Sequence, residues 1–225
     1  MRLNKVKYLE YLNDRMDSSF FNSKYISLVN SIKSLPHKPL YKLVEFSSET
    51  WNQDDYFEDS FPYIEISAID IQDGTITEIN TVEKANAPSR AKKIVRNNDI
   101  IISTTRPNRG AISHVKNIND IVIASTGFTV IRETKKEILK EYLYIILRQH
   151  SSLIQMEQRS SGGNYPAITE EELKKILIPL PPIEIQQEIV DIYNRAIEEK
   201  QAKEKEAREI MRKTKIEIER MIIGG

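Results

Sequence analysis

Five side chains that could contact nucleic acid lie within one short segment of this sequence. The segment reads STTRPNRG, and the side chains are those of Thr104, Thr105, Arg106, Asn108 and Arg109. Arginine can form a bidentate hydrogen-bonded contact with guanine in the major groove, and asparagine can do so with adenine. An apolar run precedes the segment and another follows it, which predicts a loop at the end of a strand. These residue types in such a loop indicate a candidate surface for reading bases.

Both arginines also have an ordinary alternative role. Each could form surface salt bridges, and Arg109 beside Gly110 could shape the turn. A second candidate loop, residues 159–165, carries Asn164 and could offer backbone amides to a phosphate. Its alternative role is a turn that ends a helix. For both loops, the sequence leaves binding and structural roles open.

Basic side chains are concentrated in one part of a chain whose formal net charge is zero. Residues 84–116 hold eight of them against one acid, Asp99, whereas residues 45–59 hold six acids and no base. We expect a basic face and an acidic loop; the alternative is two solvated loops. Phosphate contacts position a protein on DNA without specifying sequence. The basic residues that would suit such contacts are Arg90, Lys92, Lys93 and Arg96.

The single tryptophan, Trp51, lies in the acidic segment. We expect it to pack in the core, and the alternative is stacking at a partner surface.

No residue pattern that usually carries catalysis occurs in the chain. Its seven glycines form no phosphate-binding motif, and the acidic-Pro-Pro-aromatic tetrapeptide of amino-methyltransferases is missing. The three histidines lack acidic neighbours at metal-ligand spacing, and there is no cysteine. Asp120, Glu133 and Lys135 could form a nuclease-like set, but an E-x-K tripeptide arises easily by chance in so charged a chain. We therefore expect binding without catalysis, cofactor or metal.

The segments that would position the candidate residues predict an α+β fold. Residues 5–35 show apolar residues at helical spacing, and Pro36 and Pro39 end this region. Residues 40–182 change to short β-branched and aromatic runs interspersed with helices. The predicted strands cover residues 41–46, 62–67, 75–81, 100–104, 110–115, 120–125, 127–132 and 176–178. No apolar run approaches the ~18 residues of a membrane span.

Turn and cap signals divide this region further. We predict hairpins at Asp73-Gly74 and at Thr126-Gly127, because glycine accepts the positive φ that such turns need. One helix is predicted over residues 135–158. A shorter one follows Thr169, with Glu172 three residues later completing a capping box.

A long helix is predicted at the end of the chain. Pro181 and Pro182 set its start, and 39 residues from Glu184 to Ile222 follow without proline or glycine. Such a helix would span roughly 58 Å at 1.5 Å per residue, more than the roughly 35–45 Å expected for the preceding domain. Apolar residues line one side of its two ends but not its middle, which is typical of a rod that packs at both ends. We expect it to dock against another chain; the alternative is a helix folded back on its own domain.

Several segments, in a consistent order, resemble one known family. They are RMDSSFF (15–21), NNDIIISTTRPNRGAISHV (97–115), ASTGFTVIR (124–132), SGGNYPAITEEELKKI (161–176) and PLPPIEIQQEIV (179–190). Together they resemble the DNA-specificity subunits of Type I restriction-modification enzymes. The last segment is similar to the family's junction between a target recognition domain and a spacer helix.

The resemblance implies a specificity subunit of half the usual length. Residues 1–182 would form one target recognition domain, with a helical lead-in over 1–39 and an α+β globule over 40–182, and residues 183–225 one spacer helix. The family implication is a cytoplasmic protein that binds double-stranded DNA and directs a methyltransferase subunit and a restriction-translocase subunit to it. S-adenosylmethionine, ATP and Mg²⁺ are then expected on those partners alone.

The sequence does not decide between two explanations of the half length. The chain could be a fragment, or it could pair with itself through the helices and recognise a split palindrome. The predicted helix contacts are Ile189, Tyr193 and Ala196 of one helix against Ile210, Met211 and Ile218 of the other. The rival readings are a coiled-coil adaptor that binds protein and, third, a small nuclease.

Overall fold

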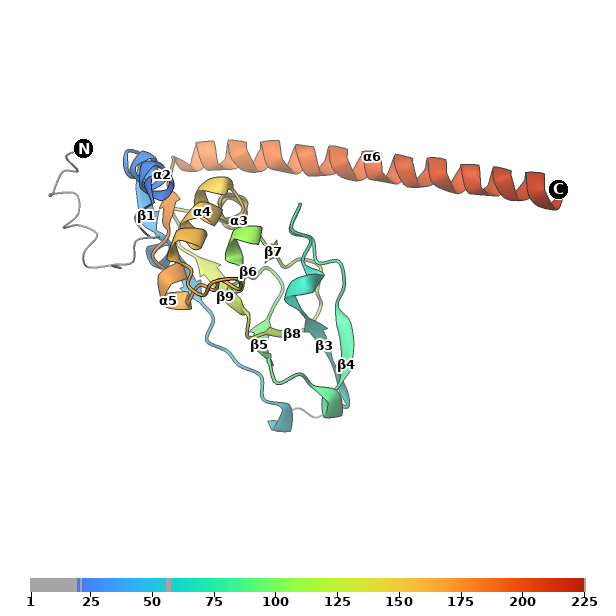
Figure 1. Ribbon diagram of the computed structural model, residues 1–225, viewed down its shortest axis with the longest axis horizontal. Coiled ribbons are helices and arrows are strands. Elements are labelled where there is room, and N and C mark those ends of the chain that lie inside the picture. Colours follow the sequence, from blue (N-terminus) through green and yellow to red (C-terminus); the bar gives the residue numbers. More distant parts are fainter. Residues whose placement is uncertain (1–19, 21, 56–57, 225) are drawn as a thin grey trace.

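The computed structural model describes residues 20, 22–55 and 58–224. It consists of a mixed α/β domain followed by one long helix that runs past the domain (Figure 1). Two sequence predictions fall outside the described residues: the start of the helical region expected over residues 5–35, and most of the RMDSSFF segment.

Two four-stranded sheets and one two-stranded sheet form the β part of the domain. The first has the order β2-β9-β6-β7, the second β4-β3-β8-β5, and β1 pairs with β10. Neighbouring strands are antiparallel except β3 and β8, which are parallel. The strands are β1 His37–Pro39, β2 Val44–Phe46, β3 Ser60–Ile64, β4 Asn80–Glu83, β5 Ala91–Val95, β6 Ile100–Ser103, β7 Ile112–His114, β8 Val122–Ser125, β9 Phe128–Thr134 and β10 Leu177–Pro179.

Five α-helices are described, and two of them, α3 and α4, cover one side of the first sheet. The five helices are α2 Ser23–Lys33, α3 Lys140–Leu147, α4 His150–Arg159, α5 Glu170–Leu173 and α6 Ile183–Ile223. The short 3₁₀ helices are η1 Leu40–Lys42, η2 Gln53–Asp55, η3 Ile66–Ala68, η4 Lys84–Asn86 and η5 Pro107–Arg109. Thr169 caps α5 as predicted, because its side chain accepts a hydrogen bond from the Glu172 amide. The Glu172 carboxylate instead binds Arg159 at 2.9 Å.

Strand β6 explains how the layers are held together. Its three isoleucines are fully buried, and successive side chains of a strand point to opposite faces. Ile100 and Ile102 join the core under helices α3 and α4, whereas Ile101 joins the core between the two large sheets. The first sheet is thus the middle layer, which is why this strand reads as a continuous apolar run.

Several strand predictions are confirmed and others are wrong. Six predicted strands correspond to β3, β6, β7, β8, β9 and β10. The predicted hairpin at Thr126-Gly127 is wrong, because β8 and β9 belong to different sheets and the chain crosses between the sheets at this turn. Residues 75–79 form no named strand, and the predicted strand 41–46 begins as a 3₁₀ helix. Strand β5, in the basic segment, was not predicted. The predicted helix 135–158 is two helices, α3 and α4.

The Asp73-Gly74 turn forms, and the segments that it joins pair through one antiparallel bridge, Ile69 with Ile76, although neither segment is a named strand. Gly74 has a φ of 78°, and its amide donates to the Asp70 carbonyl at 2.7 Å. A Cβ atom here would collide with the Tyr144 hydroxyl and lie 2.5 Å from the Ile112 carbonyl oxygen. Only glycine fits both the backbone conformation and the space.

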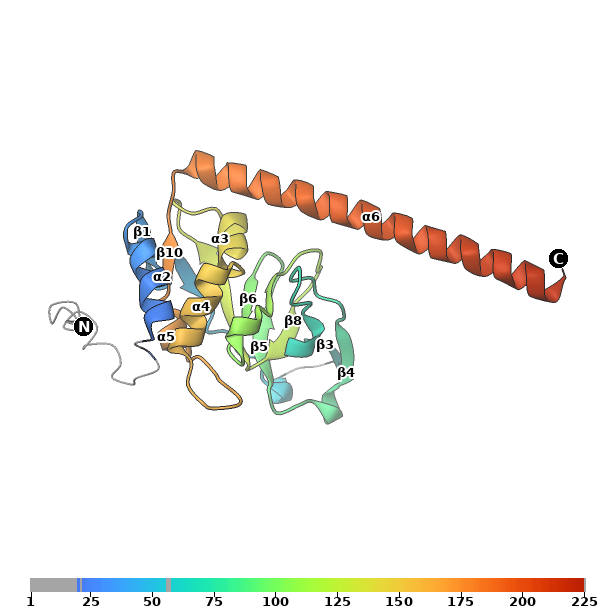
Figure 2. The ribbon, with the colours of Figure 1, turned by 45° about the horizontal axis from the view of Figure 1, so that its top comes forward.

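Helix α6 holds 41 residues, or roughly 61 Å at 1.5 Å per residue. It ends where Gly224 adopts the left-handed conformation. Its first half lies on the domain, and its second half projects beyond it (Figure 2). No helix in the described part of the chain is long and apolar enough to cross a membrane.

The first half of helix α6 makes contacts with its own domain that bear on the predicted pairing of two helices. Val190 and Gln186 of α6 are buried, and Ile189 and Tyr193 pack against the core under α3. Ile189 and Tyr193 are therefore partly buried against their own domain, where the core offers them an apolar surface. Ala196 is exposed. So are the distal residues Ile210, Met211 and Ile218.

Candidate nucleic-acid interface

Residues 103–110, hereafter the reading loop, connect β6 to β7 and meet two distant segments. On one side, the Thr104 amide and hydroxyl both donate to the Gly127 carbonyl, at 2.8 and 3.0 Å. The adjacent Thr126 amide donates to the Arg90 carbonyl at 2.8 Å. On the other side, Ile168 donates to the Thr104 carbonyl at 2.9 Å. Residues 126–127, where the chain passes from one sheet to the other, thus bring Arg90 and the reading loop together.

Arg106 is held in an unusual backbone conformation at the centre of this loop. Its φ of 47° and ψ of 52° are left-handed, which costs a residue with a side chain about 1–3 kcal/mol. The conformation is stabilised from both sides: the Arg106 amide donates to the Pro166 carbonyl at 2.7 Å, and its carbonyl accepts from Arg109 at 3.0 Å. Strained backbone conformations that the surrounding structure holds in place are concentrated at functional sites.

The Arg106 side chain packs against the loop 161–167. Its guanidinium donates to the Asn164 carbonyl at 3.1 Å and lies over the Tyr165 ring, 4.3 Å from the ring centroid. Ser161 and Ala167 close this loop by exchanging backbone hydrogen bonds of 2.9 and 2.8 Å. Tyr165 is 73% exposed, so the guanidinium stacks on a ring that otherwise faces solvent.

The other predicted base readers lie beside this stack. Asn108 and Arg109 belong to η5 and are exposed. Within the described part of the chain, neither side chain has a hydrogen-bond or ion-pair partner. Thr105 is exposed, and its backbone pairs with Ala167. The Thr104 hydroxyl is used inside the fold, on Gly127. The Asn164 side chain is exposed, while its carbonyl holds Arg106.

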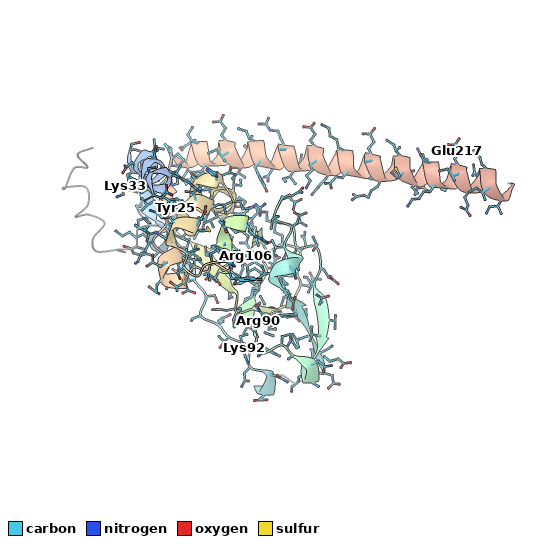
Figure 3. The ribbon with its side chains drawn as sticks, viewed as in Figure 1. Tyr25, Lys33, Arg90, Lys92, Arg106 and Glu217 are labelled. Atoms are coloured by element: carbon cyan, nitrogen blue, oxygen red, sulfur yellow. The ribbon has the colours of Figure 1, made fainter. Side chains whose placement is uncertain are left out.

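The predicted phosphate-binding residues divide into two kinds. Arg90 is exposed and Lys92 and Lys93 are half-buried; among the described residues none of the three forms an ion pair. Figure 3 shows Arg106, Arg90 and Lys92 succeeding one another down the domain in that view. Lys92 has no partner on β8, because Ala91 faces Ser125 and Lys93 faces Ala124. Such a bulge re-aims neighbouring side chains.

Arg96 is different, because its charge is already paired. Its guanidinium lies 3.0 Å from the Glu49 carboxylate, which also binds Arg132 at 3.1 Å. Glu45, another acid of the 45–59 segment, pairs with Lys135. The expectation of a separate basic face and acidic loop is therefore wrong in part. Residues 49–51 lie along β5, so Glu49 neutralises basic residues that are distant in sequence.

Below this surface, the buried carboxylate of Asp99 contacts two groups of opposite polarity. The Asp99 carboxylate accepts from the Arg96 amide at 2.8 Å and lies 2.7 Å from Arg132 Nε. Burial raises the pKa of Asp99, and the Arg96 amide and the Arg132 guanidinium oppose that rise. Trp51 is buried against Phe61, with ring centroids 4.5 Å apart. The expected core packing of Trp51 is confirmed.

A polar groove of about 600 Å³ lies elsewhere, between the domain and α6. His114, Tyr144, Asp73 and Lys200 are among its lining residues. Burial lowers the pKa of His114 to about 4, so its imidazole is neutral near pH 7. No group of three or more His, Asp or Glu residues in the described chain is placed to hold a metal ion.

From the sequence, Tyr165 was placed at the end of the candidate loop 159–165, but no role was assigned to its ring. The signal was available, since Tyr165 follows a Ser-Ser-Gly-Gly-Asn run and precedes Pro166, where an aromatic residue has little chance of burial. What the sequence could not show is that this loop meets the reading loop, because the two are about 60 positions apart in the chain.

Comparisons with known proteins agree with this architecture. The family model described as the Type I restriction modification DNA specificity domain matches residues 38–212. The chain is 32% identical over 117 residues to the Type I restriction enzyme HindI specificity subunit of Haemophilus influenzae; the match covers 51% of this chain and 25% of that relative.

Two solved structures are also similar. The HsdS subunit from Thermoanaerobacter tengcongensis has a TM-score of 0.64 and 33% identity, covering 74% of this chain and 43% of that one. A chain from a structure on complex assembly and conformational transition of the type I R-M system has a TM-score of 0.65 and 34% identity, covering 73% and 43%. The chain thus matches less than half the length of each relative.

Proposed function

Because the chain belongs to the family of Type I restriction modification DNA specificity domains, we propose that it selects the DNA sequence on which a Type I restriction-modification enzyme acts. The observation that carries the proposal is the reading loop. Arg106, Asn108 and Arg109 are presented together there, and Arg90 is linked to the same surface through residues 126–127. The proposed roles are base contact for the loop and phosphate contact for Arg90, Lys92 and Lys93.

The proposed division of labour leaves chemistry to other subunits. A methyltransferase subunit would carry S-adenosylmethionine, and a restriction-translocase subunit would carry ATP and Mg²⁺. One of the similar solved structures is described as concerning complex assembly of the type I R-M system, and this supports partner subunits of this kind. This chain would bind double-stranded DNA in the cytoplasm and have no catalytic activity of its own.

We further infer that two copies pair through α6. The distal half of the helix carries exposed apolar residues, with Ile210 and Met211 each 57% and Ile218 49% exposed. Exposed apolar side chains on a projecting helix suit a second helix. An isologous pair has two-fold symmetry, so two recognition domains would read a palindrome interrupted by a gap. Domain centres roughly 50–60 Å apart correspond to about 15–17 base pairs at 3.4 Å each.

Methylation mapping tests the proposal. The chain is co-expressed with a Type I methyltransferase subunit whose own specificity subunit has been removed, and modified adenines in the host DNA are located by sequencing. We expect one interrupted palindrome to be modified. Co-expression of the methyltransferase alone is the control. No site-specific modification with any compatible methyltransferase contradicts the proposed function, and an asymmetric site contradicts the pairing.

A further inference from the structure

We propose that Tyr165 is a positioning residue that gives the domain its preference for a guanine, acting through Arg106. The proposal rests on the proposed function, DNA reading by this surface, and adds the residue and the base type concerned. Tyr165 would not need to touch the base. Its ring would hold the guanidinium of Arg106 in the orientation that a guanine requires.

The contacts of Arg106 leave its guanidinium ready for such a role. Its face is covered by the Tyr165 ring at 4.3 Å, and one donor is used on the Asn164 carbonyl at 3.1 Å. Within the described residues, that is the one hydrogen bond of its side chain. A guanidinium carries five N–H donors in its plane. Stacking occupies a face and not the in-plane edge, so the donors that could form a bidentate contact stay free.

Holding this side chain matters because a free arginine is flexible. Fixing its rotamers on binding costs conformational entropy, and prior ordering by the protein removes part of that cost from binding. Three constraints converge on Arg106: the left-handed backbone, the Asn164 carbonyl and the tyrosine ring. The ring is the only one of them supplied by a side chain, and therefore the one that substitution can remove cleanly.

The base type follows from the donor pattern. An arginine edge with two parallel donors matches the O6 and N7 acceptors of guanine, and no other base presents two acceptors in the major groove in this way. An exposed tyrosine could instead stack directly on a base, but one face of this ring is occupied by Arg106. The stack therefore favours orientation of the arginine over direct insertion of the ring.

The experiment measures binding by the full complex of this chain with its methyltransferase subunit. Probes are the mapped site and variants in which each guanine in turn is replaced by 7-deazaguanine, which lacks the N7 acceptor. Arg106→Ala, Tyr165→Ala, Tyr165→Leu, Tyr165→Phe and the double variant Arg106→Ala/Tyr165→Ala are compared with wild type. Because Tyr165 is 73% exposed, its variants should fold, and thermal unfolding verifies this for each.

We expect wild type to discriminate against 7-deazaguanine at one position, toward the lower end of the about 5- to 150-fold range of a whole bidentate contact, because the O6 acceptor is kept. Arg106→Ala should abolish that discrimination. Tyr165→Ala and Tyr165→Leu should reduce it at the same position, Tyr165→Phe should retain it because the ring face is kept, and the double variant should resemble Arg106→Ala alone.

Other outcomes overturn the inference in distinguishable ways. If Tyr165→Ala weakens binding to all probes alike, or Tyr165→Phe behaves like Tyr165→Ala, the ring does not act through Arg106. If Arg106→Ala keeps full discrimination at every guanine, the arginine is not the reader. If the wild-type complex binds all DNA equally, the proposed function fails, and this inference fails with it.

Discussion

The Nε atom of Arg132 on β9 lies 2.7 Å from the carboxylate of Asp99, which is buried from solvent. The same guanidinium contacts Glu49 at 3.1 Å and the Ile94 carbonyl on β5 at 3.3 Å. Because β9 and β5 belong to different sheets, Arg132 joins the two sheets behind the proposed DNA-binding surface.

Replacing Arg132 should therefore destabilise the whole domain. In Arg132→Met the buried Asp99 carboxylate loses its cation, and removal of one partner of a buried pair typically costs about 3–5 kcal/mol. The measurement is denaturant unfolding at pH 7. Asp99→Asn combined with Arg132→Met should recover part of the loss. Lys135→Ala, which breaks an exposed pair with Glu45, is the control and should cost under about 1 kcal/mol. Equal effects of the two single variants would show that the buried pair contributes nothing special.

The ion pair between Asp73 and Lys200 should make the packing of helix α6 on the domain depend on pH. Lys200 Nζ donates a short hydrogen bond to the Asp73 carboxylate. Burial alone would raise the pKa of Asp73, but hydrogen bonds from Lys200 and Thr75 lower it to about 2. A lowered folded-state pKa means that the stabilisation is fully present above the unfolded-state pKa near 3.9 and is lost as pH falls toward 2.

We therefore expect Asp73→Asn to destabilise the protein by about 1 kcal/mol at pH 6. The difference from wild type should shrink between pH 4 and pH 2, as followed by thermal unfolding in far-UV circular dichroism. Glu199→Gln removes a more exposed pair with Lys203 and serves as the control, with little effect at pH 6. A difference that persists unchanged at pH 2 would rule out the carboxylate as its cause.

Lys92 and Lys93 should contribute affinity without sequence preference. In Lys92→Ala/Lys93→Ala, binding to specific and unrelated DNA should weaken alike. The slope of log affinity against log salt should fall by roughly 0.9 for each phosphate that the variant no longer neutralises. Arg96→Ala should change the slope less, because Glu49 already pairs with Arg96. The assay is fluorescence anisotropy at several salt concentrations. Loss of affinity for the specific site alone would identify the lysines as base readers instead.

The distal half of α6 should control self-association. Ile210→Glu/Met211→Glu places charges where the proposed pair buries apolar surface, and burial of unpaired charges is costly. Light scattering should show a dimer for wild type and a folded monomer for this variant, which should also fail to direct methylation. Ile210→Leu/Met211→Leu is the control and should remain dimeric. A wild-type chain that stays monomeric with its methyltransferase bound would contradict the pairing.

Local signals in the sequence determined several features by themselves. Pro182 and Gly224 bound the long helix, because one suits a helix start and the other accepts the left-handed conformation at its end. Thr169 caps α5 and Gly74 accepts the positive φ of its turn, and both features depend on a few neighbouring residues. The STTRPNRG segment was recognisable as a loop because apolar runs flank it.

Only the tertiary structure decided which of these segments meet. Turn chemistry at Thr126-Gly127 is the same whether the next strand pairs with the previous one or enters another sheet, so the crossing was invisible in the sequence. The stack of Arg106 on Tyr165 and the pairing of Arg96 with Glu49 join residues 59 and 47 positions apart. The same applies to the apolar face of α6. The spacing of its residues predicted that they would be buried but not against which surface, and only the packed core placed Ile189 and Tyr193 against their own domain. Residue types and spacing report what a side chain can do, whereas its partner depends on contacts between segments that are distant in the chain.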